Sequence, residues 1–76
     1  MSSIYSDEYQ SVIKILRSAR IDKGITQTQL AESLGKPQSF IAKVENGERR
    51  LDVIEFVTIA RLLSLDPAVI LNAVMK

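Results

Sequence analysis

The sequence predicts a compact all-α domain of five helices. Apolar residues recur at the three- and four-residue spacings of helical faces, and four capping signals divide the chain into segments of helical length. The composition agrees, because 46% apolar residues in a chain of 76 suit a small helical bundle better than a disordered chain. We therefore expect residues 1–76 to form a single domain, with residues 1–5 as a loose N-terminal arm.

The first helix is expected to begin after Ser6, whose side chain can cap the N-terminus beside Asp7 and Glu8. It should run to about Lys23 and stop at Gly24. Its inward face carries five residues at helical spacing, namely Tyr9, Val12, Ile13, Leu16 and Arg20. The arginine is the exception on this apolar face, because a charged group there needs a partner of opposite charge.

Two short helices joined by a tight turn are expected next. Thr26 and Gln29 have the spacing of a capping box, which starts the second helix, and Gly35 suits its C-terminal end. Pro37 is tolerated near the start of the third helix, which Gly47 ends. The inward face of the third helix carries Phe40, Ile41 and Val44.

The fourth helix is expected to begin after Asp52, which has the spacing of a second capping box with Glu55. Its polar residues trace one narrow ridge, so we expect a helix that is buried around most of its circumference at the centre of the domain. Asp66 and Pro67 start the last helix. The core-facing residues of that helix are expected to be Ile70, Ala73 and Val74.

The outer side of the third helix carries polar side chains that the core does not need. They include Gln38, Ser39 and Lys43. Glutamine can bond adenine bidentately, lysine can bond guanine or a phosphate, and serine can bond several partners. A helix that presents such side chains and is braced by a preceding helix has the geometry that enters a DNA major groove.

Residues 26–47 resemble the helix-turn-helix of phage repressors, Cro proteins and bacterial XRE-type regulators. The matching positions are Gln27, Ala31, Gly35, Gln38, Ile41, Val44 and Glu45-Asn46-Gly47. The resemblance extends loosely over residues 9 to 75. It implies a lambda-repressor-like fold, in which the second and third helices form the helix-turn-helix. One departure is Pro37, because the family often has a small hydroxyl residue there to cap the recognition helix.

The resemblance also implies roles for individual residues. It implies an ion pair between Arg20 and Glu45 that links the first helix to the third, and it supports a phosphate contact for Gln27. Gln27 opens the second helix, where free backbone N–H groups favour an anion. The resemblance also implies that Gln38, Ser39 and Lys43 face the bases. Further phosphate contacts are expected from the turns that flank the third helix, at Lys36, Asn46, Arg49 and Arg50.

Charge is distributed unevenly along the chain, although the net charge is only +1. Residues 14–50 hold eight lysines and arginines against four acidic residues, a balance of +4, whereas the rest of the chain balances at −3. The positive charge is thus concentrated around the helix-turn-helix, which favours DNA binding over a mixed, solvated surface.

Several classes of function are disfavoured by the residues that the chain lacks. It has no cysteine and no histidine, which removes thiolate ligands, the usual general base and the commonest metal ligand. No Gly-rich phosphate loop or carboxylate cluster is evident, so we expect no catalysis, cofactor, metal or small-molecule ligand. No run approaches the ~18 apolar residues of a membrane span, and the N-terminus does not resemble a signal peptide. We expect a cytoplasmic protein without membrane contact.

Leu71 and Met75 fall on a different side of the last helix from its core-facing residues. They are either exposed apolar residues of a frayed terminus or a contact between two copies of the chain. We favour the dimer contact, because pairing gives a small helix-turn-helix domain both stability and a longer binding site.

The expected function is a sequence-specific, double-stranded DNA-binding transcriptional regulator. More specifically, we expect a dimeric repressor that reads a near-palindromic operator through the third helix in the major groove. The alternative is a protein-interaction module, such as an antitoxin that binds a protein partner and binds DNA secondarily. The low net charge and the apolar last helix favour the alternative, whereas the polar outer side of the third helix and the two adjacent arginines favour DNA.

Overall fold

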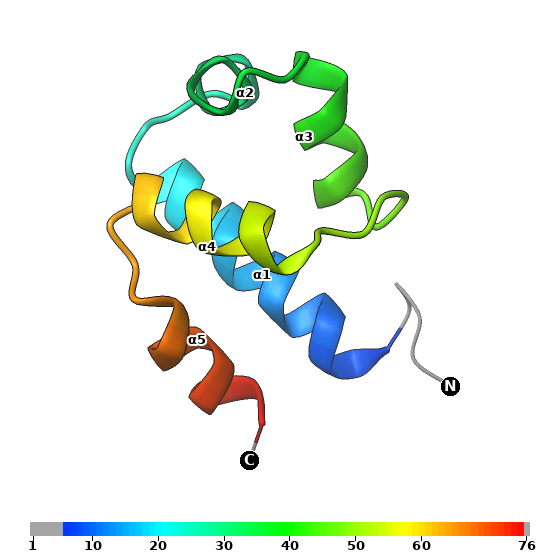
Figure 1. Cartoon of the computed structure of the whole chain (residues 1–76), viewed down its shortest axis with the longest axis vertical. Coiled ribbons are helices and arrows are strands. Elements are labelled where there is room, and N and C mark those ends of the chain that lie inside the picture. Colours follow the sequence, from blue (N-terminus) through cyan, green and yellow to red (C-terminus); the bar gives the residue numbers. More distant parts are fainter. Residues whose placement is uncertain (1–5, 76) are drawn as a thin grey trace.

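Figure 1 shows the five helices of the computed structural model, which describes residues 6–75. Their bounds are α1 (Asp7–Asp22), α2 (Gln27–Leu34), α3 (Gln38–Glu45), α4 (Val53–Leu62) and α5 (Pro67–Val74). No strand occurs in this range, so the all-α, five-helix prediction is confirmed. No helix in the same range is long and apolar enough to cross a lipid bilayer. The loose arm expected for residues 1–5 lies outside the described residues.

The N-termini of α1, α2, α4 and α5 are capped by the side chains that the sequence indicated. Ser6 and Asp66 each accept a hydrogen bond from a backbone N–H in the first turn of the helix that follows. Thr26 and Asp52 each open a complete capping box, in which the residue three positions later bonds back to the cap. Each box gives partners to two backbone N–H groups that would otherwise lack one.

The start of α3 relies on packing rather than on a side-chain cap. Pro37 is its N-cap residue, with an extended backbone and no side-chain hydrogen bond. The Phe40 N–H donates to the Pro37 carbonyl at 2.9 Å, which closes the first turn. Because Phe40 and Ile41 are buried, the core holds this end of the helix in place. Gln38 is therefore the first residue of α3.

Two glycines set the turns on either side of α3. Gly35 follows α2 with φ of 69°, and Gly47 follows α3 with φ of 77°, a region of backbone conformation that favours glycine. Gly47 is also buried, and a Cβ atom added there would lie 3.3 Å from the side chain of Gln10. The turn after α4 differs, because Ser64 has φ of 60° without being a glycine, and no residue pattern indicated this conformation.

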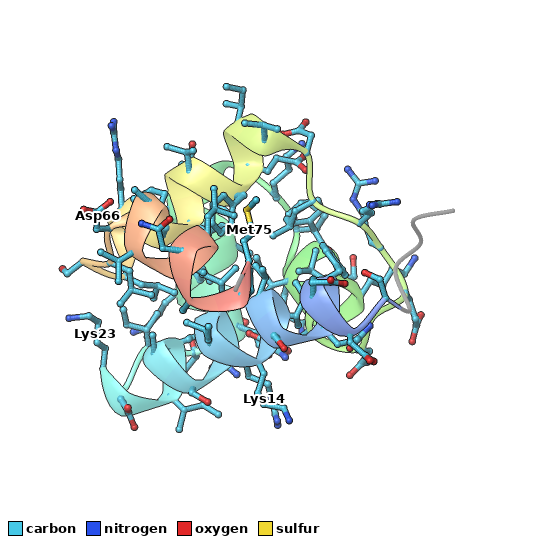
Figure 2. All side chains as sticks on the ribbon, turned by 90° about the horizontal axis from the view of Figure 1, so that it is seen from below. Lys14, Lys23, Asp66 and Met75 are labelled. Atoms are coloured by element: carbon cyan, nitrogen blue, oxygen red, sulfur yellow. The ribbon has the colours of Figure 1, made fainter. Side chains whose placement is uncertain are left out.

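One hydrophobic core joins the five helices. Within residues 6–75 its buried members are Val12, Ile13, Leu16, Leu30, Ala31, Phe40, Ile41, Val44, Phe56, Ile59, Ala60, Leu63 and Ile70. α2 packs on α3 and α4, while α1 contacts α3 and α5, and α4 also contacts α5. In Figure 1, α5 lies at the end of the molecule opposite α2 and α3. Figure 2 looks from that end and shows side chains filling the space between α1, α4 and α5.

The expectation that α4 is buried around most of its circumference is wrong. α4 buries one face, with Phe56, Ile59 and Ala60, but Val53 and Ile54 are 74% and 73% exposed. The reason is geometric: α4 packs against α2 and α5, which leaves its first turn at the surface. A domain of this size has too few elements to surround any one helix.

α5 also buries less than expected. Ile70 is buried and Val74 is half-buried, but Ala73, which was expected to face the core, is exposed. Leu71 and Met75 are exposed as well. An eight-residue helix that packs against one surface covers a single stripe of its side chains, and Ala73 lies outside that stripe.

Candidate nucleic-acid interface

α3 divides into a buried face and an exposed face. Phe40, Ile41 and Val44 are buried in the core. The residues predicted to face DNA bases, Gln38, Ser39 and Lys43, are all exposed. Two of these, Gln38 and Ser39, are the first two residues of the helix, so they project from its N-terminal end. The polar surface of α3 is therefore accessible to a partner whose surface has a groove.

Arg20 and Glu45, the two residues predicted to pair, lie in direct contact. The Arg20 Nε donates to Glu45 Oε2 at 2.6 Å, and the Nη2 donates to Oε1 at 3.0 Å. The Arg20 Nη1 also donates to the Ile25 carbonyl at 2.8 Å. Both side chains are about nine-tenths buried. The bidentate pair ties α1 to the last residue of α3 with its polar atoms satisfied.

Arg17 adds a second positive charge to this carboxylate. Its Nε lies 3.7 Å from Glu45 Oε1, while 60% of its side chain remains exposed. Sequence reasoning missed this residue, although the signal was present: Arg17 lies one helical turn before Arg20 and shares its side of α1. Glu45 therefore meets one buried and one exposed arginine.

The side chain of Gln27 makes two hydrogen bonds that the sequence did not indicate. Its Nε2 donates to Glu45 Oε1 at 2.9 Å, and its Oε1 accepts from Gln38 Nε2 at 2.7 Å. The side chain of Gln27 thus links the buried carboxylate to the first residue of α3. A glutamine can do this because its amide both donates and accepts. The Gln38 amide keeps its oxygen and one N–H group for a further partner.

The predicted phosphate-contacting residues Lys36 and Arg49 lie together beside α3, although 13 positions separate them in the sequence. The Lys36 Nζ lies 5.3 Å from the centroid of the Phe40 ring, and the Arg49 guanidinium carbon lies 4.8 Å from it. Both cations also approach Glu55 at the start of α4. The ring of a core residue therefore supports two charged groups at the surface.

Tyr9 fixes the loop that follows α3. Its hydroxyl accepts from the Leu51 N–H at 3.0 Å and donates to the Arg49 carbonyl at 3.4 Å. The Arg50 guanidinium lies over the Tyr9 ring, at 5.7 Å from its centroid. Sequence reasoning assigned Tyr9 to the inward face of α1 but did not indicate its contact with this loop.

Asn46, the remaining predicted phosphate contact, is the exposed C-cap of α3.

Residues 16–70, from the second half of α1 into α5, match a family model described as Helix-turn-helix. The chain belongs to the XRE-type helix-turn-helix family. Its structure is similar to that of an XRE-family like protein from Pseudomonas syringae pv. tomato str. DC3000, with a TM-score of 0.82 and 49% sequence identity. That similarity covers 88% of this chain and 82% of the other. No match is found among curated proteins. The helix-turn-helix protein is accordingly a DNA-binding regulator of transcription.

A largely apolar groove on the helix-turn-helix protein has no residue of α3 in its lining. Its lining comes from α1, the loop before α4, α4 and α5, and consists of Tyr9, Val12, Leu51, Val53, Phe56, Val57, Pro67 and Leu71 together with the charged residues Arg50 and Asp52. An adjoining, more polar hollow is bordered by Leu71, Val74 and Met75 on one side and by Ser6, Glu8 and Arg50 as its polar members. Leu71 lines both the groove and the hollow, and Met75 lines the hollow, so the two residues predicted to form a dimer contact border the apolar region that the apolar side chains of these two depressions form.

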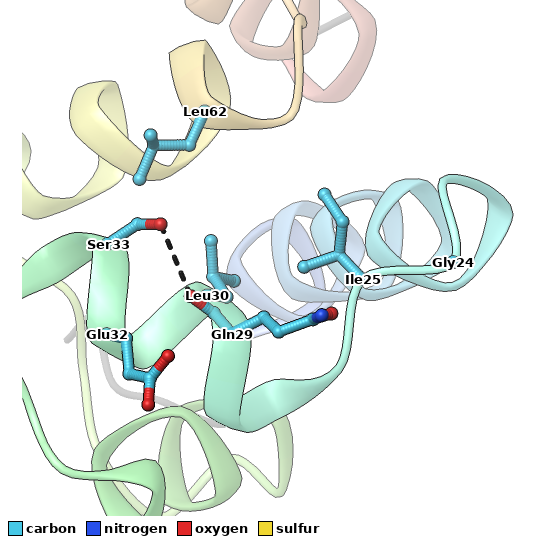
Figure 3. Close-up of a pocket in the computed structure, with 7 residues that line it drawn as sticks. All are labelled: Gly24, Ile25, Gln29, Leu30, Glu32, Ser33 and Leu62. Atoms are coloured by element: carbon cyan, nitrogen blue, oxygen red, sulfur yellow. Dashed lines mark hydrogen bonds between the residues drawn. The ribbon is translucent and has the colours of Figure 1, made fainter.

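Figure 3 shows a second groove, which is open and lies between α2 and the C-terminal end of α4. Its lining residues are Gly24, Ile25, Gln29, Leu30, Glu32, Ser33 and Leu62. The Ser33 hydroxyl donates to the Gln29 carbonyl at 3.2 Å, so part of its polarity is already satisfied. Across residues 6–75, no group of three or more acidic, histidine or cysteine side chains gathers in a way that could hold a metal ion.

Removing either partner of the Arg20–Glu45 pair is expected to destabilise the fold strongly. Glu45→Leu leaves the buried Arg20 without an opposite charge, and Arg20→Met leaves the buried Glu45 carboxylate with only the exposed Arg17 and the amide of Gln27. The loss of a buried partner costs about 3–5 kcal/mol and lowers Tm by roughly 12 °C or more. The double variant should recover part of this loss. The matched control is Arg61→Met, because Arg61 is exposed and its side chain has no partner among the described residues. Thermal unfolding followed by circular dichroism measures these effects, and an unchanged Tm in both single variants would contradict the structural role.

Proposed function

We propose that this helix-turn-helix protein is a dimeric repressor that reads a near-palindromic operator with α3 in the major groove. The observation that carries this proposal is the exposed polar face of α3, whose first side chain, Gln38, is held in place by Gln27. A side chain that is oriented before binding loses less conformational freedom in the complex. Occupation of an operator can repress transcription without further contacts, because the bound dimer excludes other proteins from that DNA.

Base recognition is assigned to Gln38, Ser39 and Lys43. The free amide oxygen and N–H of Gln38 suit the N6 and N7 edge of adenine, which is the usual partner of glutamine in the major groove. Lys43 suits the acceptors of guanine, and Ser39 can bond to several base edges. All three side chains are exposed on α3, which supports this assignment.

Phosphate contacts are assigned to Gln27, Lys36, Asn46, Arg49 and Arg50. The side chain of Gln27 is engaged by Glu45 and Gln38, so its phosphate contact is assigned to the backbone N–H at the start of α2. The other four residues flank α3 in the sequence and lie at the surface. Such contacts give affinity and orientation, but they carry no sequence information.

The dimer contact is assigned to the apolar region bordered by Leu71 and Met75. Met75 is 74% exposed and Leu71 is 41% exposed, and the groove beside them is lined mainly by apolar side chains. A contiguous apolar region of this kind on a small protein is typical of an interaction site. No residue of α3 lines it, so pairing there leaves both recognition helices accessible, and Arg50 stands at the border between this region and the proposed phosphate contacts.

Selection of bound molecules from a pool of random duplex DNA at two salt concentrations tests the proposed function. We expect enrichment of a near-palindrome with half-site centres about one helical turn apart, roughly 10–10.5 base pairs. Binding should weaken as salt increases, because phosphate contacts release counterions. Weak binding with no enriched sequence at either concentration would contradict the proposal. It would favour a protein partner at the apolar region instead.

Gln38→Ala is expected to reduce affinity for the selected operator by about 1–3 kcal/mol and to relax the sequence preference at one position of each half-site. The reason is the loss of a bidentate base contact. Lys43→Ala provides the comparison. The loss of a base contact relaxes the sequence preference, whereas the loss of a phosphate contact lowers the salt dependence of binding. Binding isotherms on the operator and on random duplex measure both. Equal weakening by Gln38→Ala on the two DNAs would contradict base recognition by Gln38.

Leu71→Asp is expected to weaken dimerisation by about tenfold or more, because it replaces an apolar side chain of the contact with a charged one that must lose its hydration. The matched control is Val69→Asp, which makes the same change on α5 at an exposed position that does not line the groove. Sedimentation equilibrium measures the dissociation constant of each variant. A wild-type monomer at high concentration, or an unchanged dimer in Leu71→Asp, would contradict this interface.

A further inference from the structure

One carboxylate, that of Glu55, meets two of the cations that are assigned to DNA phosphates. Its Oε2 lies 3.4 Å from Arg49 Nη2 and 3.9 Å from Lys36 Nζ. Lys36 precedes α3 and Arg49 follows it, so the two cations converge on the same atom from opposite ends of the helix. Both also lie over the ring of Phe40.

The position of this carboxylate is fixed by the capping box of α4. Glu55 Oε1 accepts from the Asp52 N–H at 3.0 Å, and the Glu55 N–H donates to Asp52 Oδ1 at 2.7 Å. One carboxylate oxygen therefore belongs to the helix cap and the other faces the two cations. The Glu55 side chain is 16% exposed, whereas those of Lys36 and Arg49 are 42% and 47% exposed. The anion is held in place while the cations remain accessible.

The convergence of the two cations constrains how they can meet DNA. Because Lys36 and Arg49 both lie within 4 Å of the same oxygen atom, they can serve one phosphate or two neighbouring phosphates of one strand. The sequence indicated phosphate contacts from the turns that flank α3, and the structure brings Lys36 and Arg49 from these two turns together at Glu55 of α4. In the free protein their two positive charges are partly offset by the negative charge of Glu55.

We propose that Lys36 and Arg49 form a single phosphate clamp, and that Glu55 competes with the DNA backbone for it. A phosphate can bind the two cations only if they leave the Glu55 carboxylate, so Glu55 lowers the affinity of the protein for any duplex. Because phosphate contacts carry no sequence information, the reduction is the same on operator and on random DNA. Glu55 thereby limits non-specific binding without changing which bases are read. This inference rests on the proposed phosphate contacts of Lys36 and Arg49.

Glu55→Gln isolates the charge of this residue from its capping role. A glutamine can still accept the Asp52 N–H, as Gln29 does for Thr26 in the capping box of α2, at 2.9 Å. The experiment measures binding of the full chain to one random-sequence duplex over a series of salt concentrations. Circular dichroism confirms that each variant is folded. We expect Glu55→Gln to bind about 2- to 10-fold more tightly at low salt and to steepen the slope of log K against log salt by about 1.

A double-mutant comparison shows whether the gain acts through the clamp. In a Lys36→Gln/Arg49→Gln background, the gain from Glu55→Gln should disappear. The matched control is Glu48→Gln, which removes the same charge from an exposed residue next to Arg49. Glu48 has no side-chain partner within residues 6–75. Its effect reflects the general field of the protein and should be the same in both backgrounds.

The possible outcomes separate the clamp from the proposed function. Tighter binding by Glu55→Gln that is lost in the Lys36→Gln/Arg49→Gln background supports the clamp. The clamp is overturned if Glu55→Gln weakens binding, matches Glu48→Gln, or keeps its gain in that background while the wild type binds DNA. A wild type that binds no duplex at any salt concentration overturns the proposed function, and the clamp with it.

Discussion

The bidentate pair between Arg20 and Glu45 is the interaction on which the DNA-binding half of the molecule depends. It joins α1 to the last residue of α3, and both side chains are largely buried. A buried pair adds little net stability over an apolar contact, but the loss of one partner leaves the other charge without compensation. We therefore interpret the pair as a constraint that fixes the position of α3 against α1 while the core supplies most of the stability.

A line of polar contacts leads from this pair to the surface. Glu45 also accepts from Gln27, and Gln27 in turn accepts from Gln38. The buried carboxylate of Glu45 thereby holds the exposed side chain of Gln38 in place through Gln27. Gln38 lies at the start of α3, where Pro37 provides no side-chain cap. An exposed glutamine that is not held in this way samples several rotamers, and fixing them on binding costs conformational entropy.

Four cations near α3 share two carboxylates, so this part of the surface carries an excess of positive charge although the net charge of the chain is only +1. Glu45 lies against Arg17 and Arg20, and Glu55 lies against Lys36 and Arg49. Total charge is therefore a poor guide to this interface. What matters is which cations remain accessible, how firmly their acidic partners are held, and whether a phosphate can replace those partners.

The sequence by itself determined the number of helices, most of their starts and the buried face of α3. These features are local, because caps, glycine conformations and the helical repeat depend on residues a few positions apart. The tertiary structure decided the exposure of the first turn of α4, the two partners of Gln27 and the meeting of Lys36 and Arg49 at Glu55. Each of these depends on which helices pack side by side. Spacing along the chain does not encode that packing, because it follows from how all five helices share one small core.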